Sequence, residues 1–97
     1  MPYKPTKQMQ SVAKNVLKAR AELPKSRRAG TAVGLARANQ FARGDTVSLD
    51  TVKRTYSYLS RALPVARRAG ADSKAAQAVK LWGGASALGW AKRILKK

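Results

Sequence analysis

The stretch GTAVGLARANQFARGDTVSLDTVKR, residues 30 to 54, contains two helical patterns separated by a short turn with a glycine and an aspartate. The first half combines small residues with Phe41, and the second half begins at Ser48, a favourable helix N-cap. Two consecutive helices of this kind form either a DNA-reading helix-turn-helix or neighbouring members of a helical bundle. The choice between them decides how specific a function the sequence supports.

The positions around the turn favour the bundle. In a helix-turn-helix alignment, Val47 and Val52 fall where the two helices pack, and Ala42 takes the position of a small residue. The alignment fails just before the turn, because Asp45 falls at an apolar position and Gly44 lies inside the expected helix. We therefore expect two well-capped bundle helices and no base-specific readout.

The segment that follows Ser48 predicts a helix with a core face and a basic face when its residues are placed at steps of about 100°. Asp50 lies in the first turn, where the helix dipole favours a negative charge. Pro64 either ends this helix or begins a further turn that reaches Gly70. The predicted core anchors on its inner stripe are Val52, Tyr56 and Leu59.

Two helices are expected before this segment. Thr6 is a plausible N-cap for the first, and Pro24 stops it because the residue before a proline is pushed out of helical geometry. The second helix begins at about Ala29 or Thr31 and ends at Ala42.

Two helices are expected after it. Asp72 or Ser73 caps a fourth helix, GGAS ends it, and Ser86 starts the last one. Trp82 and Trp90 are the large side chains of this alanine-rich region, so we expect both to be core anchors rather than platforms for bases.

The whole pattern predicts an all-α fold, a compact bundle of four or five short helices. No strand-like alternation of apolar and polar residues occurs in the sequence. The length of 97 residues fits a single basic helical domain spanning 1–97. Within it we expect an extended N-terminus at 1–5, a basic connector at 24–28 and a basic tail at 96–97.

Charge is the strongest functional signal in the composition. Lysine and arginine number 21 against 4 acidic residues, which gives a formal net charge of +17. The basic residues occur in nearly every segment, and a polyanionic partner would relieve their mutual repulsion. Nucleic acid is the commonest such partner, with DNA ahead of RNA, whereas anionic membranes and acidic protein surfaces are rarer.

The residues that most enzymes need are scarce. Cysteine and histidine are both absent, which removes thiol nucleophiles, imidazole bases and the usual zinc ligands. We therefore expect no enzyme activity, no metal, no cofactor and no small-molecule substrate. The sequence also has no apolar run of membrane-spanning length and no secretory signal, so we expect neither secretion nor a membrane partner.

Three separated segments stand out as motifs. Gly-Thr-Ala-Val-Gly precedes Ala-Arg-Ala at residues 30–38, and Ser-x-x-Thr-aliphatic-basic-Arg occupies 48–54. Leu-Trp-Gly-Gly follows at 81–84, with Trp-Ala at 90–91. Together they resemble a small domain common in bacteriophage genomes, where it occurs alone or attached to head-assembly proteins such as prohead proteases. The resemblance implies a phage origin and a location in the host cytoplasm or the virion, but no defined biochemical activity.

The chain departs from that domain at several positions. Members usually carry an aromatic residue at Leu59, a histidine at Ala62 and an acidic residue at Ala85. Members also have an acidic and lysine-containing segment where this chain has LPVARRAGA. Any role of those residues therefore does not transfer, and Arg67 and Arg68 make this chain more basic.

The basic residues predict phosphate contacts. RRAG occurs twice, at 27–30 and 67–70, each time in a connector between expected helices, and arginine is the better bidentate partner for phosphate. The alternative is an ordinary solvated surface, but the recurrence of one sign on every helix favours contact. The predicted nucleic-acid-binding residues are Arg27, Arg28, Lys53, Arg54, Arg61, Arg67 and Arg68.

The function expected from these observations is a small phage-encoded protein that binds nucleic acid mainly through the phosphate backbone, without catalysis. One alternative is a minor virion protein that docks on an acidic capsid or portal surface of the phage head. Another is a phage effector that binds an acidic host protein.

Overall fold

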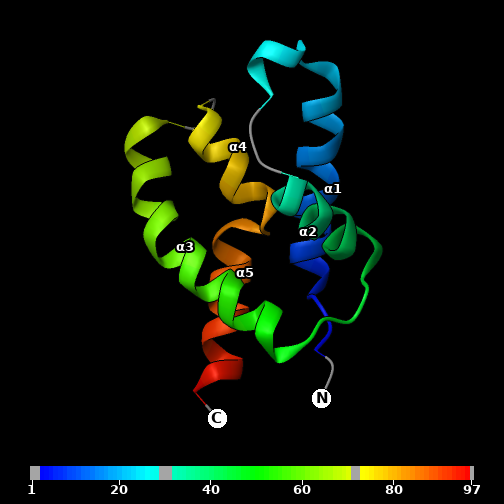
Figure 1. Cartoon of the computed structure of the whole chain (residues 1–97), viewed down its shortest axis with the longest axis vertical. Coiled ribbons are helices and arrows are strands. Elements are labelled where there is room, and N and C mark those ends of the chain that lie inside the picture. Colours follow the sequence, from blue (N-terminus) through cyan, green and yellow to red (C-terminus); the bar gives the residue numbers. More distant parts are fainter. Residues whose placement is uncertain (1–2, 29–31, 71–72, 97) are drawn as a thin grey trace.

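The structure, a computed structural model, describes residues 3–28, 32–70 and 73–96. These residues form five α-helices and one short 3-10 helix (Figure 1). In chain order they are α1 Lys7–Glu22, η1 Lys25–Arg27, α2 Ala32–Arg43, α3 Leu49–Ala69, α4 Lys74–Leu81 and α5 Gly84–Leu95. The expected all-α bundle is therefore confirmed. Within the described residues the β-structure consists of one isolated bridge, between Tyr3 and Val47.

Three helices begin where a hydroxyl caps the first turn. Thr6 accepts a hydrogen bond from the backbone N–H of Met9 at 3.1 Å, and Ser48 accepts one from Thr51 at 3.3 Å. Ser73 caps α4 in the same way. Each cap satisfies a backbone donor that has no partner inside the helix, which is why these starts are visible in the sequence. The alternative starts at Ala29, Thr31 and Asp72 lie outside the described residues.

Glycine sets the junction between α4 and α5. We expected the last helix to start at Ser86, but it starts at Gly84, with Gly83 as its N-cap. Gly83 has a φ of +91°, a left-handed conformation that glycine adopts without a steric penalty. The chain therefore turns from α4 into α5 within two residues, and the Ser86 hydroxyl donates to the Gly83 carbonyl at 2.8 Å.

Pro64 does not end α3. The helix continues through it to Ala69 and stops at Gly70, whose φ is +99°. Proline has no N–H, so the carbonyl of Ser60 loses its helical donor at this turn. Both residues are exposed, and water can replace the missing bond. The longest helix is therefore a single 21-residue element.

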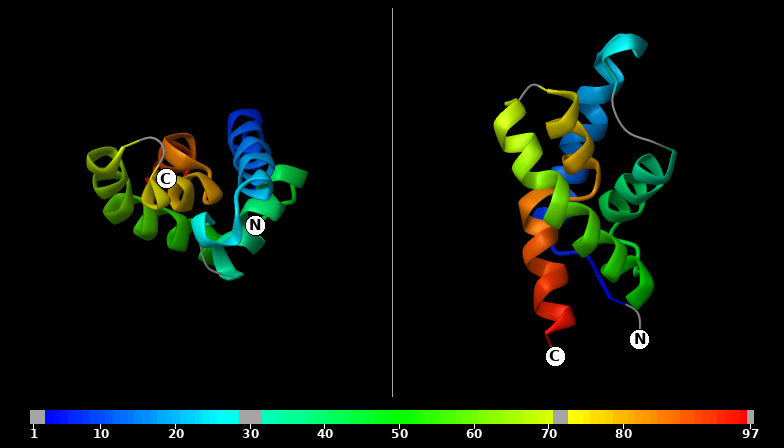
Figure 2. Two further views of the ribbon diagram at one scale, coloured as in Figure 1. Left: turned by 90° about the horizontal axis from the view of Figure 1, so that it is seen from above. Right: turned by 60° about the vertical axis from the view of Figure 1, so that its left-hand side comes forward.

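The helices form three layers. In the view from above, α4 and α5 lie between α3 on one side and α1 with α2 on the other (Figure 2). Correspondingly, α3 packs on α5 and α4, while α1 packs most extensively on α2. The radius of gyration is 12.5 Å, compared with about 13 Å for a compact chain of 100 residues. None of the described helices combines the length and apolar character that crossing a membrane requires.

This layering separates the two halves of the stretch at 30–54. α2 packs on α1 and α4, whereas α3 packs on α5 and α4 on the far side of the middle layer. A helix-turn-helix needs its two helices packed on each other. The arrangement is that of a bundle, with Val47, Val52 and Phe41 all buried in one core.

The core anchors follow the expectation with one correction. Val52 and Leu59 are fully buried, and Trp90 is 6% exposed. Trp82, at the end of α4, is half-buried. Tyr56 is 37% exposed and is not in the core, so its predicted place was wrong. The buried side of α3 contains Thr51, Thr55 and Ala66 as well as the large side chains of Val52, Leu59 and Leu63. It is therefore rotated away from Tyr56.

Candidate nucleic-acid interface

The outer face of α3 carries the expected basic residues. Lys53, Arg54 and Arg61 are all exposed, and Arg61 lies on the side of α3 next to α4, where it lines a small pocket with Ala75 and Ala78. The guanidinium of Arg54 forms an ion pair with Asp50, one turn earlier, at 3.0 Å. Both side chains are well exposed, so this pair adds little stability but reduces the local positive charge. Lys53 and Arg61 are therefore the stronger candidates for phosphate contacts on this face.

The last turn of α3 extends the same surface. Arg67 and Arg68 are exposed there, at the end of the helix whose dipole is negative. The chain then turns at Gly70, whose carbonyl oxygen accepts a hydrogen bond from the Ser73 hydroxyl at 2.7 Å. Arg67 and Arg68 consequently lie beside the start of α4, where Lys74 is also exposed.

The first basic connector lies at the same end of the molecule. The side-chain amide of Gln77 donates to the carbonyl oxygen of Arg27 at 3.3 Å, which joins η1 to α4. Figure 1 shows η1, the last turn of α3 and the first turn of α4 toward one end of the long axis. The second RRAG was expected in a connector, but its arginines belong to α3, because that helix continues through Pro64 to Ala69. The fold thus brings Arg27 of η1 and Arg67 of α3, 40 residues apart in sequence, to one end. We call this surface the basic end; its exposed cations are Lys25, Arg27, Arg67, Arg68 and Lys74.

Arg28 has a structural role that the sequence did not indicate. Its Nε donates to the carbonyl oxygen of Leu23 at 3.0 Å, and its Nη2 donates to that of Ala21 at 3.1 Å. These carbonyls lie at the C-terminal end of α1, where no further helical N–H is available. Arg28 is therefore a half-buried cap for α1 that uses two of its donors, and its phosphate contact stays a prediction.

Few carboxylates oppose these cations. Two ion pairs join side chains within the described residues, Arg43 with Asp45 and Arg54 with Asp50. Glu22 is exposed near η1, and Asp72 lies outside the described residues. In the part of the chain that the structure describes, no group of three or more His, Cys, Asp or Glu side chains is placed to hold a metal ion. The positive field of the surface is thus largely uncompensated.

Four aromatic side chains, Phe41, Tyr58, Trp82 and Trp90, pack against one another in pairs. The rings of Tyr58 and Trp82 lie 5.1 Å apart, and the guanidinium of Arg37 lies 5.7 Å from the centre of the Trp82 ring. Partial burial raises the pKa of the Tyr58 phenol. Trp90 meets Phe41 edge to face at 6.1 Å and donates its indole N–H to the carbonyl of Lys4. These rings join helices to one another.

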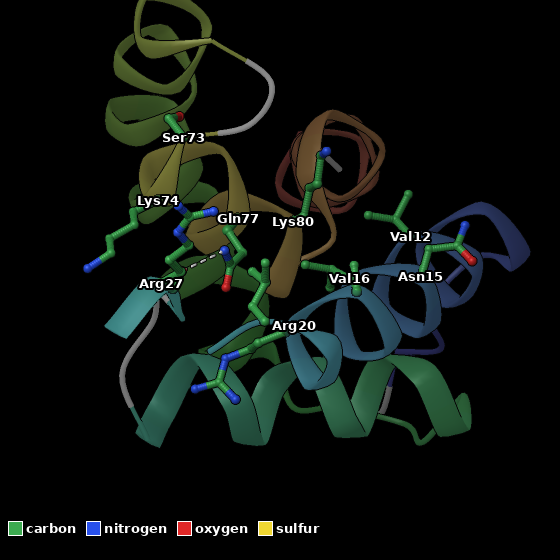
Figure 3. Close-up of a pocket in the computed structure, with 11 residues that line it drawn as sticks. Val12, Asn15, Val16, Arg20, Arg27, Ser73, Lys74, Gln77 and Lys80 are labelled. Atoms are coloured by element: carbon green, nitrogen blue, oxygen red, sulfur yellow. Dashed lines mark hydrogen bonds between the residues drawn. The ribbon is translucent and has the colours of Figure 1, made fainter. Parts of the chain in front are cut away.

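A groove between α1 and α4 is a second feature of this surface (Figure 3). It has a volume of about 830 Å³ and runs to η1 at the basic end. Its apolar lining consists of Val12, Val16, Ala19 and Leu23. Its cationic lining consists of Arg20, Arg27, Lys74 and Lys80, and its neutral polar lining consists of Asn15, Ser73 and Gln77.

Sequence periodicity did not predict this groove, because it depends on the distance between two helices far apart in the chain. One signal was available in the sequence. Val12 and Ala19 widen the apolar stripe of α1 beyond the width that one neighbouring helix covers. Arg27 was the only lining residue among the predicted binding residues.

No family model, curated protein or solved structure matches the chain. The bacteriophage resemblance of its three motif segments accordingly stays a prediction.

Proposed function

We propose that this protein binds nucleic acid through the phosphate backbone and carries out no catalysis. The observation that supports this most directly is the basic end, where the fold gathers arginines and lysines from η1, the end of α3 and the start of α4. The outer face of α3 continues the surface with Lys53 and Arg61. Contacts from exposed cations to phosphates supply affinity and orientation without reading sequence.

In this proposal DNA is the nucleic acid that the protein binds preferentially. A continuous run of cations along a helix face and one end of a bundle suits a regularly spaced line of phosphates. If five or six phosphates are neutralised, the logarithm of the binding constant should fall with the logarithm of salt concentration with a slope of about −5.

The test compares duplex DNA, single-stranded DNA and RNA of one length by fluorescence anisotropy at two salt concentrations. The test variant replaces Lys53, Arg61, Arg67 and Arg68 with glutamine. The control variant removes the same charge from exposed positions on α1, on α5 and at the C-cap of α5, namely Lys14, Lys18, Lys92 and Lys96. We expect the test variant to lose more affinity and to show a salt slope smaller in magnitude by about 3. No binding of the unmodified protein to any of the three at moderate salt would refute the proposal.

The phage resemblance extends the proposal to a location. A phage-encoded protein of this kind would act beside the genome, in the host cytoplasm or inside the virion. A minor head protein docked on a capsid or portal surface would instead co-purify with emptied heads and would not be retained on duplex DNA at physiological salt. Comparison of full and emptied heads therefore separates the two.

A further inference from the structure

The groove between α1 and α4 has the dimensions of a helix-binding site. Its lining on α1 extends from Val12 to Leu23. At 1.5 Å per residue this is about 16 Å, or three helical turns. On the other wall the lining extends along α4 from Ser73 to Lys80. Two roughly facing helices with an open channel between them offer a third helix an apolar seat.

The floor of the groove is apolar and only partly covered. Val16 is buried in a small cluster with Ala38 and Leu81. Val12 and Leu23 are half-buried, and Ala19 is exposed. Apolar surface in a concave channel is unfavourable in water and is stabilised when a partner covers it. Nucleic acid phosphates would pair with the rim but would leave this floor uncovered.

The rim is cationic on both walls. Arg20 and Arg27 lie on the side of α1 and η1, and Lys74 and Lys80 lie on α4 (Figure 3). Among the described residues that line the groove, none is acidic. Lys74 and Lys80 are separated by about 9 Å along α4. The cations are therefore spread along the length of the groove. A single anionic headgroup would instead be bound by cations clustered at one point.

We propose that this groove binds an acidic amphipathic helix of a partner protein. The apolar stripe of that helix would cover Val12, Ala19 and Leu23, which keep exposed apolar surface. Its flanking carboxylates would pair with the cations of the rim. A second copy of this chain is unsuitable, because each copy has a net charge of +17 and only four acidic residues. This proposal does not depend on the proposed nucleic-acid function.

A designed peptide pair tests the proposal. The probe is an 18-residue helix with leucines at i, i+3, i+4 and i+7 and glutamates on either side of the stripe. The control peptide has the same composition in scrambled order, so it keeps the charge and loses the apolar face. We expect the amphipathic peptide to bind about 10-fold more tightly at physiological salt, because burial of the apolar stripe adds to the shared charge attraction. Equal affinity for both peptides, or no binding of either, overturns the proposal.

Paired variants then locate the binding. Ala19→Glu places a carboxylate on the floor at an exposed helical position, and Ser11→Glu adds the same charge to an exposed position of α1 outside the groove. We expect the Ala19→Glu variant to lose most of the preference for the amphipathic peptide and the Ser11→Glu variant to keep it. Likewise, K74Q with K80Q should weaken peptide binding by about 2–10-fold more than K14Q with K18Q.

Circular dichroism is first used to check that each variant is folded, and binding is then measured. Equal effects of the paired substitutions overturn the assignment to the groove. The same variants are tested with duplex DNA. If Ala19→Glu selectively weakens duplex binding and not peptide binding, the groove is a nucleic-acid site and the proposed helix partner is wrong.

Discussion

The side-chain amide of Gln77 donates a hydrogen bond to the main-chain carbonyl oxygen of Arg27, 50 residues earlier in the chain, at 3.3 Å. The bond holds η1 against α4 and so keeps the main chain of Arg27 next to the helix that carries Lys74. Positioning of this kind reduces the conformational entropy that a binding surface loses when a ligand orders it.

Gln77→Ala should therefore weaken nucleic-acid binding although it changes no charge. We expect a two- to fivefold loss of affinity, because a typical hydrogen bond contributes about 0.5–1 kcal/mol. The salt slope should stay the same, since the number of phosphates contacted is unchanged. Anisotropy titrations over a salt series measure both quantities, and a changed slope with unchanged affinity would contradict this role.

Arg27 and Arg28 should respond differently to alanine substitution. Arg28→Ala removes the donors to the carbonyls of Ala21 and Leu23, so we expect the free energy of unfolding to fall by about 1 kcal/mol. Arg27→Ala leaves those bonds intact and should reduce nucleic-acid affinity at nearly constant stability. Chemical denaturation and binding assays on both variants check this, and identical profiles would show that the distinction is wrong.

Alanine substitution at Gly83, the N-cap of α5, and at Gly89 within α5 should change the stability of the fold in opposite directions. An alanine at Gly83 would adopt a φ of +91° and place its Cβ 2.6 Å from that of Ala87, so Gly83→Ala should destabilise the fold by about 1–3 kcal/mol or more. At Gly89 an added Cβ only meets the Arg93 guanidinium at 3.5 Å. Gly89→Ala should therefore stabilise the protein by about 0.5–1 kcal/mol. Thermal unfolding distinguishes the two outcomes, and stabilisation by both substitutions would argue against the left-handed cap.

Tyr58 should make stability depend on pH in the alkaline range. Because burial raises its pKa in the folded state, the folded protein holds the phenol proton where the unfolded chain has lost it. The contribution of Tyr58 to the free energy of unfolding is complete below the ordinary tyrosine pKa of about 10. This contribution is lost as the pH rises from there through the pKa of Tyr58 in the folded protein. Denaturation of the unmodified protein and Tyr58→Phe over this range should show a smaller alkaline loss in the variant, and parallel curves would contradict it.

Local signals explain which parts of the fold were predictable. The caps at Thr6, Ser48 and Ser73 each depend on a hydroxyl and an N–H three residues away. Such short-range interactions can be predicted from the local sequence. Pro24 is equally local, since it acts on the residue before it. The start of α5 was misplaced because Ser86 offers the same capping group as the others. Here the left-handed conformation of Gly83 lets α5 begin at Gly84, two residues before Ser86.

Non-local packing explains what was missed. Tyr56 was expected in the core because it falls near Val52 and Leu59 on the helix, but Thr51, Thr55 and Ala66 are also buried, so the buried side of α3 is rotated away from Tyr56. Arg28 matched a phosphate-binding pattern, and only the turn at η1 brings it back to the end of α1. The groove required the spacing of α1 and α4, which no single segment encodes. The exposure of Lys53, Arg54 and Arg61 was predictable because it follows the periodicity of α3, whereas Arg67 and Arg68 were expected in a connector and instead extend that helix.

The pairing of Tyr3 with Val47 and the bond from Trp90 to Lys4 bear on the order in which the chain assembles. Val47 is made 44 residues after Tyr3, and Trp90 is made 86 residues after Lys4. Closing loops of that length costs entropy that only late contacts repay. The contacts of the N-terminal segment with Val47 and with α5 therefore form late, whereas α1 can pack on α2 before α5 has been made. A bound polyanion at that stage would shield the nascent cations from one another and favour collapse.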